Sequence, residues 1–384
     1  MLRNPKERHD MQTQIPVTLL TGFLGAGKTT LLNGLLHDPA AGRIAVVVNE
    51  FGDAGLDHDL IEETAEDVVL MAAGCICCTI RGDLSRTLMS LLKRRTKGEL
   101  SFDRVVIETT GLADPRPVHH TLLVDKDLAA NFALDGIVTA VDSVLAADTL
   151  DRHAEAQAQV AMADRIVLTK RDLANRAARR ALERRLDRLN PGAERIEADR
   201  GKVPSGALFG LSAMRKEVSR NHALDWLAAS PAAAQVDPLA GLSGIDLPKA
   251  DPLPEFGAQS HHATDSRIVT ASVTIDTPIP TRVFDFWLDT LIALRGADIL
   301  RLKGIVHIED VPTPFVFHGV QHVFEPPVPL KDWPAGDHTS RVVVIARDFP
   351  LEDLEQSLAM LRMRPKERDE TQGVTVHTLS AEAL

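Results

Sequence analysis

The chain has 384 residues, of which 44% are hydrophobic and 25% charged, and its formal net charge is −11. This composition is typical of a globular protein, and the length suggests two domains or one large domain with an appendage. The acidic balance argues against a general nucleic-acid-binding surface, which needs a basic excess. No apolar run approaches the roughly 18 residues of a membrane span, and the polar N-terminal stretch lacks the apolar core of a signal peptide, so we expect a cytoplasmic protein with no membrane partner.

Short apolar runs alternate with helical patterns through the first half of the chain. A run at 16–20 leads into the glycine-rich stretch TGFLGAGKTT, and apolar residues at helical spacing follow it. Later runs are RIAVVVNEFGD, DVVLM, FDRVVIETTG, LDGIVTAVDS and ADRIVLTKRD, while Leu84, Leu88, Leu91 and Leu92 predict a helix. Near-continuous Val and Ile runs are typical of strands covered on both faces, so we predict an α/β fold with a mainly parallel sheet. Functional loops are expected at the carboxyl ends of its strands.

The stretch Gly22–Thr29 fits the pattern GxxxxGK[ST] between a predicted strand and a predicted helix, which is the context of a phosphate-binding P-loop. Glycines let the backbone wrap around phosphates with its amides pointing inward. Lys28 is then expected to reach the β- and γ-phosphates, and the Thr29 hydroxyl to bind Mg²⁺. The nucleotide-binding residues predicted here are Gly22, Gly25, Ala26, Gly27, Lys28, Thr29 and Thr30.

The three cysteines of the chain, Cys75, Cys77 and Cys78, fall within four consecutive positions. A disulfide between neighbouring Cys77 and Cys78 would be strained, whereas a tetrahedral ion such as Zn²⁺ accommodates closely spaced thiolates. Three thiolates leave one coordination position open for water, Asp53 or His58. We therefore predict a transition-metal site, with buried packing or a redox switch as the alternatives.

An acidic residue, Glu108, ends the predicted strand RVVIE and precedes Thr109-Thr110-Gly111. In P-loop proteins an acid at this strand end holds the metal through water. We expect Glu108 to do so here and the Gly111 amide to face a γ-phosphate; a solvated strand-end acid is the alternative.

A second polar motif, Thr169-Lys170-Arg171-Asp172, ends the run RIVLTKRD. An aspartate in this place can accept hydrogen bonds from the N1–H and 2-amino groups of guanine, and ATP would leave that acceptor unpaired. The aliphatic stem of Lys170 could cover the base. Thr169, Lys170 and Asp172 therefore favour GTP over ATP, with a surface charge cluster as the alternative.

The composition changes after about residue 230, where a stretch rich in Pro, Ala, Gly and Asp predicts a linker over 230–265. A β-α-β-β-β-α pattern follows and predicts a smaller α+β domain with a mainly antiparallel sheet. We thus expect a tail at 1–15, a P-loop domain at 16–229, this linker, a C-terminal domain at 266–365 and a tail at 366–384.

Several histidines are weaker candidates for metal ligands. His318 and His322 are four residues apart in one predicted strand, so they would share a face and could form an accessory site with His307. The polar side of a half-exposed strand is the favoured interpretation. For His119 and His120, which follow ADPRP, a solvated helix start is favoured.

These motifs together resemble those of the CobW-type GTPases, which are P-loop metallochaperones. The matching stretches are VTLLTGFLGAGKTTLL, NEFGD, GCICC, VIETTGLADP, ADRIVLTKRD and LRLKGIVHI with FVFHGVQHVFEPP. The resemblance implies a GTPase domain followed by a smaller C-terminal domain, and zinc or cobalt-like ions bound at the CxCC site. Some relatives carry an acid where this chain has Val48, so any carboxylate ligand would be Glu50, Asp53 or another residue.

The sequence therefore predicts a GTP hydrolase that binds a divalent transition metal, zinc in preference to cobalt, and delivers it to a client protein. Lys28, Thr29, Glu108 and Gly111 would serve hydrolysis. No residue stands out as a general base for the attacking water, and Glu50 and Asp53 are weak candidates for that role. GTP would order the loop that carries the cysteines, and hydrolysis would release it. The alternatives are a cobalt-handling GTPase of cobalamin biosynthesis and a non-enzymatic metal buffer or redox sensor. The client and the oligomeric state, including a homo-oligomer, stay open.

Overall fold

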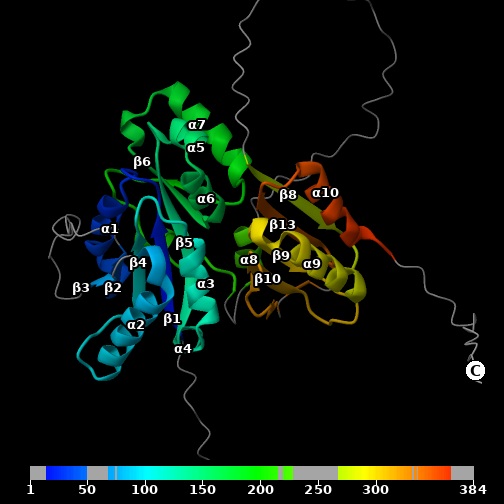
Figure 1. Cartoon of the computed structure of the whole chain (residues 1–384), viewed down its shortest axis with the longest axis horizontal. Coiled ribbons are helices and arrows are strands. Elements are labelled where there is room, and N and C mark those ends of the chain that lie inside the picture. The colour runs from blue at the N-terminus through cyan, green and yellow to red at the C-terminus, as the bar shows by residue number, and fades with distance from the viewer. Residues whose placement is uncertain are drawn as a thin grey trace, which may run out of the picture.

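A seven-stranded, wholly parallel sheet organises the first part of the chain in the computed structural model (Figure 1). The structure describes residues 14–49, 68–73, 76–214, 219–227, 267–330, 333–334 and 336–364. The predicted linker and most of both predicted tails therefore lie outside the described residues. The strand order is β3-β2-β4-β1-β5-β6-β7. The strands are β1 Ile15–Thr21, β2 Ile44–Asn49, β3 Val68–Ala73, β4 Arg104–Thr109, β5 Phe132–Asp142, β6 Arg165–Thr169 and β7 Glu194–Glu197.

Helices cover both faces of this sheet, as the continuous apolar runs predict. Val17 and Leu19 of β1 pack with leucines of α2 on one face, whereas Leu20 packs with Leu31 of α1 on the other. In α2, Leu84, Leu88 and Leu91 are buried, which confirms the predicted helix. The helices are α1 Lys28–Leu36, α2 Ile76–Thr96, α3 Arg116–Val124, α4 Lys126–Asn131, α5 Ala146–Arg152, α6 Ala154–Met162, α7 Arg176–Leu189 and α8 Arg220–Leu227. No described helix is long and apolar enough to cross a membrane.

The later part of the chain forms a six-stranded antiparallel sheet, as predicted. Its main path is β11-β10-β9-β13-β8, and β12 pairs with β10. Helices α9 and α10 cover one face, where Phe284, Trp287 and Leu354 are buried. The elements are β8 Ile268–Ile275, α9 Thr281–Arg295, β9 Ile299–Val306, β10 Phe315–Val320, β11 Val323–Phe324, β12 Val328–Pro329, β13 Ser340–Arg347 and α10 Leu351–Ala359. We call the elements β1–α8 the N-terminal unit and β8–α10 the C-terminal unit.

One predicted strand is wrong in its extent. The stretch PFVFHGVQHVFE forms two strands, β10 and β11, which pair as a hairpin with Val320 opposite Val323. The chain reverses at Gln321, whose φ is 56°. Because the turn uses a non-glycine residue in the left-handed region, the sequence carries no turn signal there. His318 and His322 therefore do not share the face of one strand.

The second face of the antiparallel sheet packs against the N-terminal unit, and Figure 1 shows the two units side by side. A buried ionic network joins them. Arg301 and Lys303 of β9 both contact Asp164, which follows α6, and the Lys303 Nζ–Asp164 Oδ1 distance is 3.0 Å. The Asp164 side chain also accepts a hydrogen bond of 2.9 Å from the Ile137 amide. The cations and this amide hold the pKa of Asp164 below its usual range although burial acts to raise it.

Lys303 gives this network a pH dependence that can be measured. Burial, assisted by the Arg301 charge, lowers the pKa of Lys303 from 10.5 to about 7. Between these two values the unfolded chain keeps the Lys303 proton and the folded chain releases it, so stability should rise with pH. Replacing Lys303 with methionine should remove this rise, which amounts to at most about 1.4 kcal/mol per pH unit.

Urea unfolding at pH 7, 8 and 9 would measure the free energy of unfolding of both proteins. Lys126→Met is the matched control, because Lys126 is exposed on α4. Parallel pH dependences for the Lys303→Met variant and the unsubstituted chain would show that Lys303 stays protonated in the folded state.

Candidate functional site

The glycine-rich loop has a backbone that only glycine allows at several places. Gly25 and Gly27 have φ values of 71° and 88°, in the left-handed region. At Gly22 a Cβ atom would lie 2.4 Å from the carbonyl oxygen of Ala140 in β5. The loop leaves β1 and enters α1 at Lys28, whose side chain is buried. The predicted order of strand, glycine loop and helix is thus confirmed.

Two oxygen atoms meet at the end of this loop. Thr29 Oγ1 donates a hydrogen bond of 3.0 Å to Glu108 Oε1, across 79 positions of sequence. Strand β4 lies beside β1, with Glu108 paired to Leu20, so sheet register brings the carboxylate to the loop. Glu108 is only 5% exposed. A hydroxyl and a carboxylate in contact are the hard oxygen donors that Mg²⁺ prefers, so the residues present fit this ion.

The segment after β4 lies against the P-loop. A Cβ atom at Gly111 would be 2.6 Å from the backbone nitrogen of Leu24, so glycine permits this approach. On its other side, Gln159 of α6 donates hydrogen bonds of 3.1 Å and 3.0 Å to the carbonyl oxygens of Gly111 and Ala113. Gly111 is thus held between α6 and the P-loop, on the side where we expect the phosphates.

The TKRD motif is tied to the same loop. Thr169 Oγ1 donates to the Ala26 carbonyl at 2.8 Å, and Lys170 Nζ donates to the Gly25 carbonyl at 2.7 Å. Lys170 also contacts Asp142 at the end of β5, at 2.7 Å, which is a partner that sequence reasoning missed. The only sequence signal for Asp142 is that this acid directly follows a run of apolar residues. Asp172 is exposed in the short helix that follows β6, so its carboxylate is accessible to a ligand.

The cysteine motif lies at the same edge of the sheet but farther from the P-loop. β3, β2, β4 and β1 are successive neighbours, so at the usual strand spacing β3 ends about 14 Å from the P-loop strand. Helix α2 begins at Ile76, so Cys77 and Cys78 belong to its backbone instead of to the loop expected from sequence. Their side chains, and Cys75, Glu50, Asp53 and His58 altogether, lie outside the described residues.

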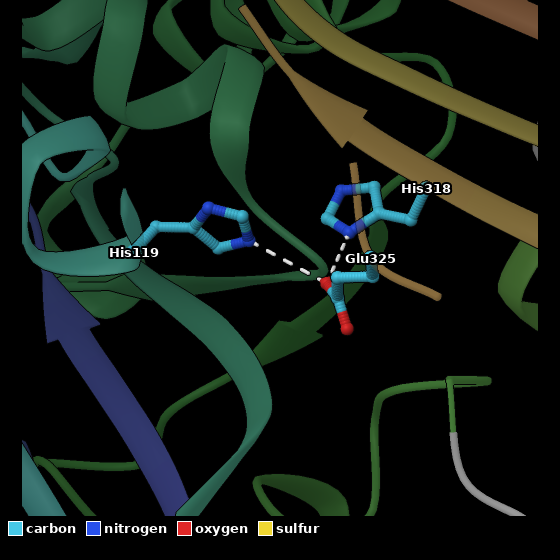
Figure 2. A group of neighbouring side chains, drawn as sticks. All are labelled: His119, His318 and Glu325. Carbon is cyan, nitrogen blue, oxygen red and sulfur yellow. Dashed lines mark hydrogen bonds and ion pairs between the residues drawn. The ribbon is translucent and has the colours of Figure 1, made fainter. Parts of the chain in front are cut away.

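One histidine of the N-terminal unit and one of the C-terminal unit lie together in an arrangement that the sequence did not predict. His119 of α3 is 0% exposed, which contradicts the expected solvated helix start, and it lies with His318 and Glu325 (Figure 2). His307 instead lies against Trp333 and His338. The alternative grouping of His307 with His318 and His322 is therefore wrong, and so is the favoured half-exposed strand face, because His307 and His318 are buried. Helical periodicity cannot show which face of α3 meets another part of the chain.

Comparison with known proteins agrees with this architecture. Residues 16–197 match the family model described as CobW/HypB/UreG, nucleotide-binding domain, and residues 268–362 match the cobalamin synthesis protein cobW C-terminal domain. The chain is 34% identical to a zinc chaperone, YjiA, of Escherichia coli, over 91% of this chain and 99% of the relative. It is 30% identical to a zinc-regulated GTPase metalloprotein activator of Schizosaccharomyces pombe, over 87% and 83%.

Solved structures extend the agreement to three dimensions. The Zn(II)-bound YjiA GTPase from E. coli is 28% identical and superposes with a TM-score of 0.68 over 91% of this chain and 99% of that one. A Zn(II)-bound triple mutant of the same GTPase is 29% identical and gives a TM-score of 0.69 over the same shares. Because the similarity spans both sheets and the residues of the P-loop edge, the chain belongs to the CobW family of P-loop proteins.

Proposed function

We propose that this protein is a GTP-hydrolysing metallochaperone. It binds a divalent transition metal, zinc in preference to cobalt, at its CxCC motif and delivers it to a metal-dependent client protein, with GTP controlling the metal affinity. The observation that carries the hydrolase part is the Thr29–Glu108 contact at the end of a P-loop. The metal part is supported by the whole-length similarity to a relative named as a zinc chaperone.

In this proposal, different residues at the P-loop edge bind the phosphates, Mg²⁺ and guanine. Lys28 and the loop amides hold the phosphates, and Thr29 and Glu108 hold Mg²⁺, which when bound neutralises phosphate charge. The Gly111 amide faces the γ-phosphate, since the segment that contains it touches the P-loop backbone. The carboxylate of Asp172, exposed in the short helix after β6, accepts hydrogen bonds from guanine. The nucleotide-contacting set is Gly22, Gly25, Ala26, Gly27, Lys28, Thr29, Thr30, Thr169, Lys170 and Asp172.

Metal binding in this proposal uses Cys75, Cys77 and Cys78, with Glu50 or Asp53 as further ligands. Strand β2 lies between β3, which precedes the cysteines, and β4, which contains Glu108. Glu50 and Asp53 follow β2 directly in sequence and lie outside the described residues. Only β2 separates β3 from β4, so in this proposal a change at the γ-phosphate reaches the cysteines across one strand of the sheet. A metal buffer without hydrolysis is less well supported, because Thr29 and Glu108 bring together the two oxygen donors that would hold Mg²⁺.

A competitive zinc titration tests the proposal on the full chain, with Mg²⁺ and a non-hydrolysable GTP analogue, with Mg²⁺-GDP, and without nucleotide. We expect tighter zinc binding with the GTP analogue than with GDP, by roughly 5- to 150-fold, the usual range of coupling between sites. A Cys75→Ser, Cys77→Ser, Cys78→Ser triple variant should lose this difference and still bind nucleotide. Equal zinc affinity in the two nucleotide states would refute the coupling. Parallel titration with Co²⁺ separates zinc from cobalt as the favoured cargo.

A further inference from the structure

Three potential metal ligands converge on the boundary between the two units (Figure 2). His119 comes from α3, His318 from β10, and Glu325 directly follows β11. His318 Nδ1 lies 2.7 Å from Glu325 Oε1, and His119 Nε2 lies 3.6 Å from the same oxygen. One ligand atom from each residue falls within 4.8 Å of the other two. The group is thus assembled only when the C-terminal unit lies against α3.

The imidazoles of this group have unmet bonding capacity. His119 is 0% exposed and His318 3% exposed. Neither ring nitrogen of His119 has a hydrogen-bond partner, and neither does Nε2 of His318. The 3.6 Å separation between His119 and Glu325 exceeds hydrogen-bond length. Burying a polar group without a partner is unfavourable, so a ligand that bonds His119 would stabilise this arrangement.

The distances and the donor types together suit a transition-metal ion. With metal–nitrogen and metal–oxygen bonds of about 2.0–2.2 Å, ligand atoms in a tetrahedral site lie about 3.3–3.6 Å apart. The 3.6 Å pair already fits this spacing, and the 2.7 Å pair would open by less than about 1 Å. Two imidazoles and one carboxylate are the protein ligands of many open zinc sites, whereas Mg²⁺ and Ca²⁺ take oxygen ligands only.

A direct histidine–carboxylate–histidine hydrogen-bond chain is the competing interpretation. A small rotation would let His119 Nε2 reach Glu325, and Nδ1 would stay unpaired in that chain as it would in a metal site that uses Nε2, so metal binding itself distinguishes the two. The nearby cations do not exclude a metal ion. Lys303, which pairs with His318 in the sheet, and Arg301 both contact Asp164, so their charge is partly offset.

We propose that His119, His318 and Glu325 form a second divalent transition-metal site between the two units, separate from the cysteine motif and independent of it. Metal bound there ties the β10–β11 hairpin to α3. Helix α3 begins at Arg116, shortly after Gly111, whose segment lies against the P-loop. The site therefore connects the C-terminal unit to the part of the N-terminal unit that is closest to the nucleotide.

The test uses the full chain with Cys75, Cys77 and Cys78 all replaced by serine, and Co²⁺ as the spectroscopic probe. We expect this protein to bind Co²⁺ with the d–d absorption of nitrogen and oxygen ligands and no thiolate-to-cobalt charge-transfer band. Adding His119→Gln or Glu325→Gln should weaken binding by at least roughly 10- to 100-fold, which is the loss seen when residues that only support the metal ligands are replaced. His37→Gln is the matched control, because His37 is an exposed histidine directly after α1, and it should leave the affinity unchanged.

Thermal unfolding in the presence and absence of Zn²⁺ guards against a folding artefact. The cysteine-free protein should gain a higher unfolding midpoint with Zn²⁺. The Glu325→Gln protein, which keeps an amide beside His318, should gain less at the same Zn²⁺ concentration and should unfold at an unchanged midpoint without metal. Unchanged Co²⁺ affinity in both substituted proteins, or no Co²⁺ binding by the cysteine-free protein, would overturn the proposal. With the cysteines intact, His119→Gln should retain the thiolate charge-transfer band, which separates this site from the one proposed above.

Discussion

Replacing Lys28 with alanine should abolish most GTP hydrolysis while leaving the fold intact. Lys28 begins α1 at the end of the P-loop, and its side chain is 9% exposed. Its ammonium group is the one positive charge that the loop itself provides to the β- and γ-phosphates. Removing a single group that stabilises transition-state charge typically lowers kcat by about 10²- to 10³-fold. We expect a loss at least that large.

Phosphate release at saturating Mg²⁺-GTP measures this effect. Lys126→Ala is the matched control, because Lys126 is an exposed lysine on α4, and its turnover should equal that of the unsubstituted chain. A thermal unfolding midpoint close to that of the unsubstituted chain would confirm that the Lys28→Ala protein is folded. If this variant still hydrolysed GTP at a rate within a few-fold of the original, the P-loop would not be the catalytic site.

Replacing Asp164 with asparagine should lower the free energy of unfolding by about 3–5 kcal/mol, the cost of breaking a buried ionic pair by removing one partner. The Asp164 and Arg301 side chains are 4% and 3% exposed, so water cannot compensate the cations that the change leaves behind. The amide of asparagine keeps the shape of the side chain but has no charge. The structure thus predicts that the Asp164 carboxylate, at the boundary, contributes strongly to the stability of both units.

Urea unfolding at pH 7 tests this expectation, with Asp148→Asn as the control. Asp148 forms an exposed ion pair with Arg152, and exposed pairs are worth about 0–1 kcal/mol. Adding Lys303→Met to Asp164→Asn should restore part of the stability, because a buried amine that has lost its carboxylate partner is removed. Similar losses for Asp164→Asn and Asp148→Asn would show that the boundary is hydrated in solution.

The amino-acid sequence determined those features that depend on local backbone preferences and on periodicity. The glycines of the P-loop adopt φ values that other residues avoid, and the loop therefore forms where its motif stands. The continuous apolar runs required strands covered on both faces, and the leucines of α2 required a helix with one buried face. Parallel strand order then placed Glu108 beside Thr29, as the strand-end motif led us to expect.

Only the tertiary structure decided which polar residues from the two units meet. Arg301 and Asp164 are 137 positions apart, and the residues between them offer no local signal of the pair. The chain reverses at Gln321 without a glycine, so the sequence pattern does not reveal the turn. This turn places His318 and His322 outside a single strand. His119 is buried because α3 lies against the hairpin of another unit. The physical reason is that periodicity reports whether a face is buried but not what covers it, and long-range charge pairing depends on the covering surface.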